Sequence, residues 1–151
     1  MEKVTGYLTR RRAGGWQLLV FHDPGWPNFG WVVPGGTVEA GEGLEAAMRR
    51  EILEESGRSD VMTLSYLGAV RHTSAAGDEV CRHFFAGTVG ADCPDRFTHV
   101  TQSADEDNGW VCRYEWLDIG SDAPVLGGHL GLGLPALRAA LKSGTIAIHS
   151  V

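Results

Sequence analysis

Apolar and polar residues alternate along much of this chain, and that alternation is typical of half-buried β-strands. Residues 4–11 and 16–22 show it, and the Ala13-Gly14-Gly15 segment between them suits a tight turn, so a β-hairpin is predicted. Further strands are expected at residues 31–33, 61–72, 79–89 and 110–117. A polar turn at 74–78 predicts that the two strands beside it are antiparallel.

Helical spacing occurs twice, first in an acidic segment at residues 44–55 and again at residues 134–142. A glycine-rich connector at 127–133 precedes the second segment. The stretches at 22–30 and 92–108 are rich in turn-forming and polar residues and are expected to be loops, with a short structured piece near Phe97. These elements together predict a mixed β-sheet with helices packed on it.

The acidic helix carries an apolar stripe that continues into carboxylates. Leu44, Ala47 and Met48 share one helical face, and Glu51 and Glu55 extend that face. Acids that point inward raise the free energy of the fold unless they meet a cation or a water-filled cleft. The stripe therefore indicates chemistry as well as packing.

Three carboxylates meet at the end of this helix. Glu51, Glu54 and Glu55 are spaced i, i+3 and i+4, so a helix places them side by side. A hard divalent cation bound by their oxygens would remove the repulsion between them. The alternative is a solvated acidic helix end in which Arg50 pairs with Glu54. The inward-facing stripe favours the metal site.

The segment before this helix is expected to bring backbone close to the acids. Residues 31–33 resemble a short strand, and Pro34-Gly35-Gly36 a sharp turn in which the glycines allow positive φ and close approach to a ligand. Glu42 lies near the helix N-terminus, where the macrodipole favours negative charge. Gly57 suits the left-handed position that ends a helix.

Composition is that of a globular protein of ordinary size. The chain has 151 residues, of which 43% are hydrophobic and 21% charged, and a single domain over residues 1–151 is expected. A formal net charge of −6 argues against nonspecific binding to nucleic acid or to an anionic membrane. It does not exclude a phosphate substrate, because a bound divalent metal supplies positive charge.

The three cysteines, Cys81, Cys93 and Cys112, lack the paired spacing of a metal site and are expected to be reduced thiols in the cytoplasm. The apolar run at 16–21 is too short for a secretory signal, and no segment has the length and hydropathy expected of a membrane span.

A longer pattern surrounds the acidic cluster. Its seven fixed residue types are Gly36, Glu42, Arg50, Glu51, Glu54, Glu55 and Gly57, and Ile52 fills one of its two apolar positions. Residues 36–58 thereby resemble the Nudix box of the Nudix hydrolases. A chance match of seven residue types in a chain of this length has a probability on the order of one in a million. The chain departs from the pattern at Arg58, where the family usually has an apolar residue.

The resemblance implies an α/β (α+β) fold of the Nudix type, an α/β/α sandwich in which helices flank a mixed β-sheet. It implies a metal-dependent hydrolase that cleaves the diphosphate linkage of a nucleoside diphosphate joined to another moiety, with Mg²⁺ or Mn²⁺ as cofactor. The expected partner is a small nucleotide-type diphosphate. Homodimers are common in the family, so a homodimer is a family-level expectation.

Roles transfer from the family to matching positions. Glu54 and Glu55 resemble the principal metal ligands, and Glu51 resembles a third ligand or a base that acts through metal-bound water. Arg50 resembles the residue that orients these carboxylates. Glu42 matches an upstream acid whose role is water-mediated metal binding or structure.

Two further groups are expected near the metal. Gly35 precedes the first glycine of the box and could offer its carbonyl oxygen. Some family members supply a general base from a later loop, and the acids at 105–107 are the candidates here, with Glu106 nominated among them. Sequence does not select one acid, and a polar turn without catalytic role is the alternative.

Substrate selection is expected outside the box. Trp26, Phe29 and Trp31 precede it, and a nucleobase could stack on one of them, although Trp31 fits a strand core better. His72 and His83 could contact phosphate, but isolated histidines are more often ordinary strand residues.

Two alternatives to the hydrolase stay open. One is a catalytically silent Nudix-like module that binds a nucleotide or has a regulatory role, although such modules often lose box carboxylates and this chain keeps all of them. The other is a structural protein with an acidic, metal-storing helix, which the lack of repeated acidic loops disfavours.

Overall fold

One mixed β-sheet carries the helices in this computed structural model, which describes residues 1–120 and 125–144. The elements are, in chain order, β1 (Glu2–Arg12), β2 (Gly15–His22), β3 (Gly35–Thr37), α1 (Leu44–Ser56), β4 (Leu64–Thr73), β5 (Glu79–Thr88), β6 (Arg96–Val100), β7 (Val111–Asp118), the 3₁₀-helix η1 (Leu130–Gly133) and α2 (Leu134–Ser143). No helix among these residues is both long and apolar enough to cross a membrane.

Strand β1 lies at the centre of the sheet. The strand order is β4-β5-β1-β2-β7-β6, with β3 paired to β1 beside this path. The pairing of β1 with β5 is parallel and the other pairings are antiparallel. A strand covered on both faces has a continuous rather than alternating buried run, and residues 4–9 of β1 are all buried.

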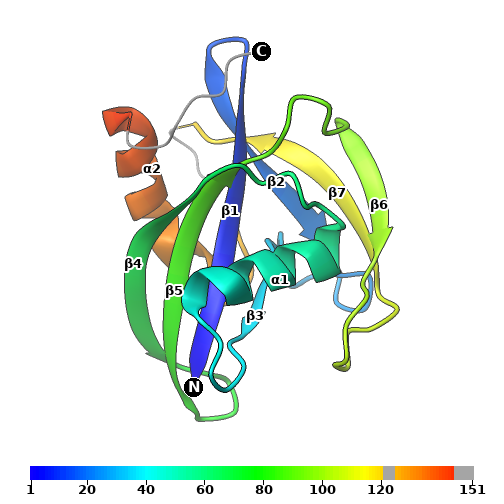
Figure 1. Cartoon of the computed structure of the whole chain (residues 1–151), viewed down its shortest axis with the longest axis vertical. Helices are drawn as coiled ribbons and strands as arrows, with labels where there is room; N and C mark the ends of the chain where they lie inside the picture. Colours follow the sequence, from blue (N-terminus) through cyan, green and yellow to red (C-terminus); the bar gives the residue numbers. More distant parts are fainter. Residues whose placement is uncertain (121–124, 145–151) are drawn as a thin grey trace.

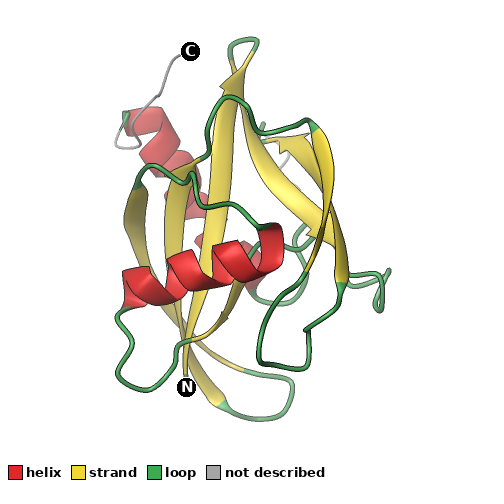
Figure 2. Ribbon diagram, turned by 45° about the vertical axis from the view of Figure 1, so that its right-hand side comes forward, coloured by secondary structure: helices red, strands yellow, loops and turns green. Residues whose placement is uncertain are grey.

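The two faces of the sheet carry separate hydrophobic cores. In β2, Leu19 and Phe21 pack in the core that includes α1, whereas Leu18 and Val20 pack in the core that includes α2. This is the period-two alternation of a strand between two layers. Figures 1 and 2 show α1 crossing one face of the sheet while α2 lies behind it. The predicted α/β/α sandwich with a mixed sheet is confirmed.

Helix α1 has the predicted stripe and the predicted end. Ala47 and Met48 are buried, and Glu51 and Glu55 continue that buried face. Gly57 takes a left-handed φ of 71°, and its N–H donates to the Leu53 carbonyl. The helix therefore ends where the sequence predicted.

The hairpin of β1 and β2 is also confirmed. Its two-residue loop has positive φ at Ala13 (46°) and Gly14 (81°), as the type I′ turn of tight hairpins requires. The antiparallel pairing of β4 with β5 and the structured piece near Phe97, which is strand β6, are confirmed as well.

Two local predictions are wrong. Residues 31–33 do not form a strand: Val32 and Trp31 make isolated bridges, to Phe21 and to Leu126 respectively. The Pro34-Gly35-Gly36 segment is not a turn, because Gly35–Thr37 is strand β3. Neither glycine has a positive φ; instead, a side chain at either position would collide with a neighbouring atom.

The glycine-rich connector before α2 is partly structured. Residues 130–133 form η1, and the Tyr7 hydroxyl donates to the Leu130 carbonyl (2.5 Å) while it accepts from the Gly133 N–H (3.1 Å). A buried tyrosine of β1 thus fixes the start of α2. Local sequence patterns do not predict this contact, since the two partners are more than 120 residues apart in the chain.

Candidate active site

The carboxylates at the end of α1 are packed against the backbone of β3. Glu51 and Glu55 are only 4% and 7% exposed, and Glu54 beside them is partly buried. A Cβ atom on Gly36 would overlap the Glu51 carboxylate, and one on Gly35 would overlap the Val4 carbonyl of β1. Glycine is required here because strand backbone and carboxylate approach each other closely.

Gly35 also supplies a donor to the cluster. Its N–H donates to Glu55 Oε1 (3.3 Å). Residues of an antiparallel pair alternate between bonding to the partner strand and pointing away from it, so Gly35 directs its polar groups toward the acids and not toward β1. The predicted proximity of Gly35 to the acids is therefore present, in a strand and not in a turn.

A single guanidinium holds three of the acids. Arg50 donates from Nε and Nη2 to the two oxygens of Glu42 (2.8 and 2.9 Å). Its Nη1 donates to Glu51 Oε1 (2.9 Å) and lies 3.4 Å from Glu54 Oε2. Such bidentate, charge-assisted bonds fix orientation as well as lowering energy. Arg50 thus orients the carboxylates, and Glu42 orients Arg50.

Glu42 differs electrostatically from the acids of α1. Hydrogen bonds from Arg50, then from the Glu39 N–H, lower the pKa of Glu42 to about 2. Both oxygens of Glu42 face Arg50 and not the other acids. Of the two roles expected for Glu42, water-mediated metal binding and structure, this arrangement is consistent with the structural one, in which Glu42 fixes Arg50.

The acids on α1, in contrast, have raised pKa values. Burial raises the pKa of Glu55 well above its ordinary value, and the facing charge of Glu51 adds to the shift. Burial also raises the pKa of Glu51 and of Glu54, against the opposing effect of Arg50. Protonation is one way to reduce the repulsion between acids packed this closely. A bound divalent cation would supply the compensating positive charge instead and would stabilise their ionised forms.

A cavity of about 530 Å³ opens beside this cluster. Glu55, Gly35 and Gly36 line one part of it. The aromatic residues lining it are Trp26, Phe29 and Trp110 in addition to the buried Phe21. Trp26 and Phe29 stack on each other at 4.7 Å between ring centroids. Trp31 instead stacks on His22 at 3.6 Å and does not line the cavity.

The loop at 105–107 does approach the acids. The charge of Asp107 contributes to the raised pKa of Glu54 and Glu55. Asp107 lines the cavity, and Ser103 Oγ donates to its Oδ1 (2.5 Å). Glu106 is exposed and does not line the cavity. Of the predicted loop acids, Asp107 lines the cavity, the charge of Asp105 also raises the pKa of Glu54, and Glu106 does neither.

Sequence reasoning missed two positive groups that line the cavity. Lys3 and Arg82, register partners on β1 and β5, both line it. Arg82 donates to Thr5 Oγ1 (2.9 Å) and to His72 Nε2 (3.2 Å), and among the described residues no carboxylate forms an ion pair with it. An uncompensated, half-buried guanidinium is suited to an anionic ligand.

Two histidines also line the cavity. His72 stacks on His129 at 3.8 Å between ring centroids, and both line the cavity. The Nδ1 atom of His72 is buried without a hydrogen-bond partner among the described residues. His83, the other histidine considered, does not line the cavity.

A protein-family model, the NUDIX domain, matches residues 3–124 of the chain. A search of curated protein sequences found no match to this chain. Among solved structures, a NUDIX hydrolase from Nitrosomonas europaea has 22% identity and a TM-score of 0.64, covering 92% of this chain and 88% of that one. The NUDIX domain of Shewanella oneidensis NrtR, solved with ADP ribose, has 17% identity and a TM-score of 0.65 (93% and 88% covered). A C. elegans Ap4A hydrolase binary complex has 16% identity and a TM-score of 0.64 (94% and 98% covered).

The raised pKa values give a pH prediction for the metal-free protein. Folded protein keeps protons on Glu51 and Glu55 that the unfolded chain releases near pH 4.5, the ordinary value. The unfolded state then binds fewer protons, so the free energy of unfolding falls as pH rises from about 4.5 through the raised folded values. Urea unfolding in chelator at a series of pH values measures this fall.

The matched variants are Glu55→Gln and Glu45→Gln, both on α1. Glu55→Gln removes one of the facing acids and should flatten the pH dependence. Glu45 is exposed and pairs with Arg49, so Glu45→Gln should leave the pH dependence as it is. Equal slopes in both variants would contradict the assignment of the fall to the buried acids.

Proposed function

This chain belongs to the NUDIX family, and we propose that it is a divalent-metal-dependent hydrolase that cleaves a diphosphate linkage in a nucleotide or nucleotide derivative. The observation that carries the proposal is the cluster of Glu51, Glu54 and Glu55. Arg50 holds Glu51 and Glu54, and Glu55 lines a cavity that Lys3 and Arg82 also line. A candidate metal ligand and two cationic side chains thus line one cavity.

The donor set fits Mg²⁺ or Mn²⁺. Hard divalent ions prefer carboxylate and carbonyl oxygens, and Glu51, Glu54 and Glu55 would hold such an ion, with the Gly35 carbonyl as a further donor. When bound, the metal neutralises diphosphate charge and lowers the pKa of a bound water. Burial raises the pKa of each of the three acids in the metal-free protein, and a bound cation would offset this effect.

Arg50 and Glu42 act as positioning residues. Their bidentate pair fixes the guanidinium, and the guanidinium fixes Glu51 and Glu54. Ligand carboxylates held by a surrounding hydrogen-bonded group lose less entropy when they bind a metal. Arg50 therefore contributes without touching substrate.

The general base is Glu51 or Asp107. Glu51 lies within the acid cluster and would accept a proton from water there. Asp107 lines the cavity, and Ser103 orients its carboxylate. Glu106, which was nominated from sequence, is exposed and has no comparable position.

The cavity suggests how a nucleotide is bound. Arg82 and Lys3 provide positive charge for a phosphate group, and Trp26, Phe29 or Trp110 provide a face for a base. The two kinds of group lie in one cavity, as a ligand with a charged and an aromatic part requires. A homodimer remains a family-level prediction.

The first test is hydrolysis of a substrate panel with Mg²⁺, with Mn²⁺ and with chelator. The panel contains nucleoside triphosphates, oxidised nucleotides, ADP-ribose, nucleotide sugars, NADH and dinucleoside polyphosphates. Turnover should depend on metal, and Glu54→Gln should lower kcat by about 100-fold or more, because a metal ligand is lost. Glu45→Gln is the control and should stay within about twofold.

Two outcomes contradict the proposal. Unchanged turnover in Glu54→Gln would remove Glu54 from the metal site. Binding of a panel member without turnover in the folded protein would favour the silent, nucleotide-binding module.

Asp107→Asn and Glu106→Gln form a matched pair for the loop acid. If Asp107 is the base, Asp107→Asn should lower kcat by about 100-fold and remove the acidic limb of the pH profile, because the amide cannot accept a proton. Glu106→Gln should leave both unchanged. A normal profile in Asp107→Asn would assign the base to Glu51.

Arg82→Gln tests the anion-binding group. Loss of a charge that contacts phosphate in ground and transition states alike should raise KM by about tenfold and change kcat less. Steady-state kinetics measures both, with Arg12→Gln, at the exposed hairpin end, as the control. Equal KM values for the two variants would exclude Arg82 from substrate binding.

A further inference from the structure

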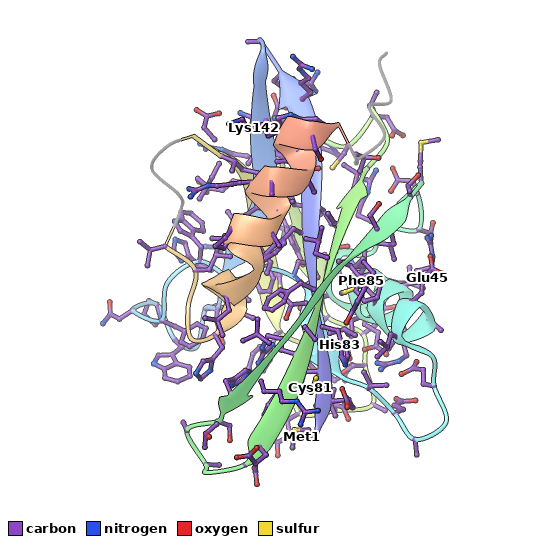
Figure 3. The ribbon with its side chains drawn as sticks, turned by 90° about the vertical axis from the view of Figure 1, so that its left-hand side faces the viewer. Met1, Glu45, Cys81, His83, Phe85 and Lys142 are labelled. Atoms are coloured by element: carbon purple, nitrogen blue, oxygen red, sulfur yellow. The ribbon has the colours of Figure 1, made fainter. Side chains whose placement is uncertain are left out.

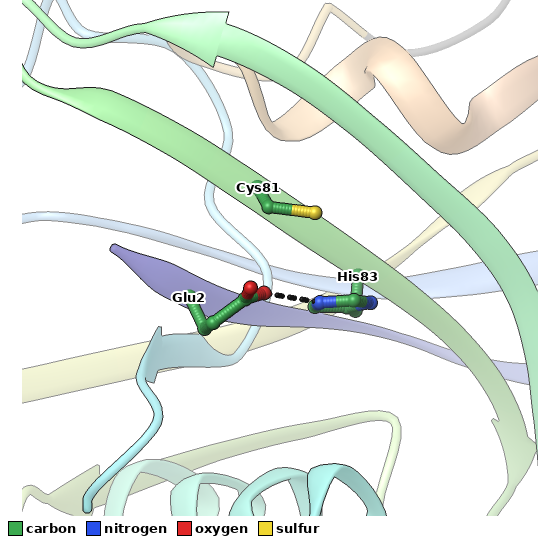
Figure 4. A group of neighbouring side chains, drawn as sticks. All are labelled: Glu2, Cys81 and His83. Carbon is green, nitrogen blue, oxygen red and sulfur yellow. Dashed lines mark hydrogen bonds and ion pairs between the residues drawn. The ribbon is translucent and has the colours of Figure 1, made fainter.

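Three side chains with metal-binding atoms converge away from the cavity, near the starts of β1 and β5. One donor atom from each of Glu2, Cys81 and His83 lies within 4.8 Å of the other two. Figure 4 shows the carboxylate of Glu2 on β1 directed toward His83, with the Cys81 thiol beside them on β5. Figure 3 shows Cys81 and His83 in succession along β5, near Met1.

Parallel pairing brings these side chains together. Glu2 is the register partner of Cys81, and Val4 is the partner of His83. Residues two apart in a strand share a face, so Glu2, Cys81 and His83 lie on one face of the sheet. Lys3 and Arg82 fall between them in both strands and point to the other face, where they line the cavity. None of Glu2, Cys81 and His83 lines the cavity, so the cluster lies outside the candidate active site, although α1 packs on the same face of the sheet.

His83 is oriented by a second residue. Its Nδ1 lies 2.9 Å from the Tyr66 hydroxyl, while its Nε2 contacts the Glu2 carboxylate. The register of β4 shifts between Tyr66 and Gly68, and such a bulge redirects side chains. Histidine ligands usually donate their other ring N–H to a neighbouring oxygen, which leaves the remaining nitrogen free for a metal. Tyr66 is placed for that role.

The donor set differs from that of α1 in its metal preference. Thiolate, imidazole and carboxylate together suit Zn²⁺, whereas Mg²⁺ prefers oxygen alone. Donors around a tetrahedral Zn²⁺ are about 3.5 Å apart, so Glu2 and His83, which are in hydrogen-bond contact, would separate to admit the ion. Glu2 is 55% exposed and His83 13%, which leaves a path from solvent.

We propose that Glu2, Cys81 and His83 bind one Zn²⁺ through a carboxylate oxygen, Sγ and Nε2, with water as the fourth ligand. Binding releases the thiol proton and the proton between His83 and Glu2, and no bond other than those to metal forms. A Glu2–His83 ion pair without metal is the alternative. In that alternative, the Glu2 carboxylate accepts hydrogen bonds from His83 and from the Cys81 thiol, and no metal enters.

Cobalt(II) titration of the reduced, full-length protein tests the proposal. A thiolate ligand gives a sulfur-to-cobalt charge-transfer absorption that carboxylates cannot give, so the acids of α1 do not interfere. The band should saturate at one equivalent, disappear when Zn²⁺ is added, and persist in excess Mg²⁺. Absence of the band in the wild-type protein would overturn the proposal.

Variants assign the ligands. Cys81→Ser and His83→Ala should remove the band, whereas Cys93→Ala, at a buried cysteine outside the cluster, should keep it. Tyr66→Phe deletes one oxygen and should weaken binding by about tenfold. Glu54→Gln should keep the band even though hydrolysis fails, so the two proposals can fail separately. A band that survives Cys81→Ser would place the metal elsewhere.

Discussion

Close packing of carboxylates against strand backbone is the constraint on which the rest of the site depends. Glu51 can occupy its position only because Gly36 has no side chain, and Gly35 can pair with β1 only for the same reason. Strand β3 therefore ties the acids of α1 to the central strand of the sheet. The free-energy cost of burying those acids is offset in part by Arg50, and a bound cation would offset the remainder.

Sequence patterns predicted the elements that local periodicity controls. Alternation located the hairpin and the β4–β5 pair, and the apolar stripe of α1 located the buried acids. The Pro34-Gly35-Gly36 segment was misjudged because glycine serves two physical ends, positive φ and close approach, and sequence does not separate them. The same ambiguity did not affect Gly57, because its position after a helical stripe specifies a left-handed cap.

Groups that depend on distant pairing were beyond sequence reasoning. Lys3 and Arg82 meet because β1 and β5 are parallel neighbours, and nothing local to either residue indicates that pairing. Asp107 rather than Glu106 reaches the cavity because the loop between β6 and β7 directs it there, with Ser103 as its partner. The cysteines likewise showed no metal-site spacing, since the residues near Cys81 include one 79 positions away in the chain.

The pairing of β1 with β5 gives neighbouring residues two different chemical roles. Lys3 and Arg82 face the cavity, whereas Glu2, Cys81 and His83 face the opposite side. A metal held by the second group would cross-link the two strands on either side of the Lys3–Arg82 pair and reduce the freedom of the strand ends. Groups that bind an anion lose less conformational entropy when their backbone is already fixed. A metal bound by Glu2, Cys81 and His83 would thereby pre-organise the two cations that line the cavity.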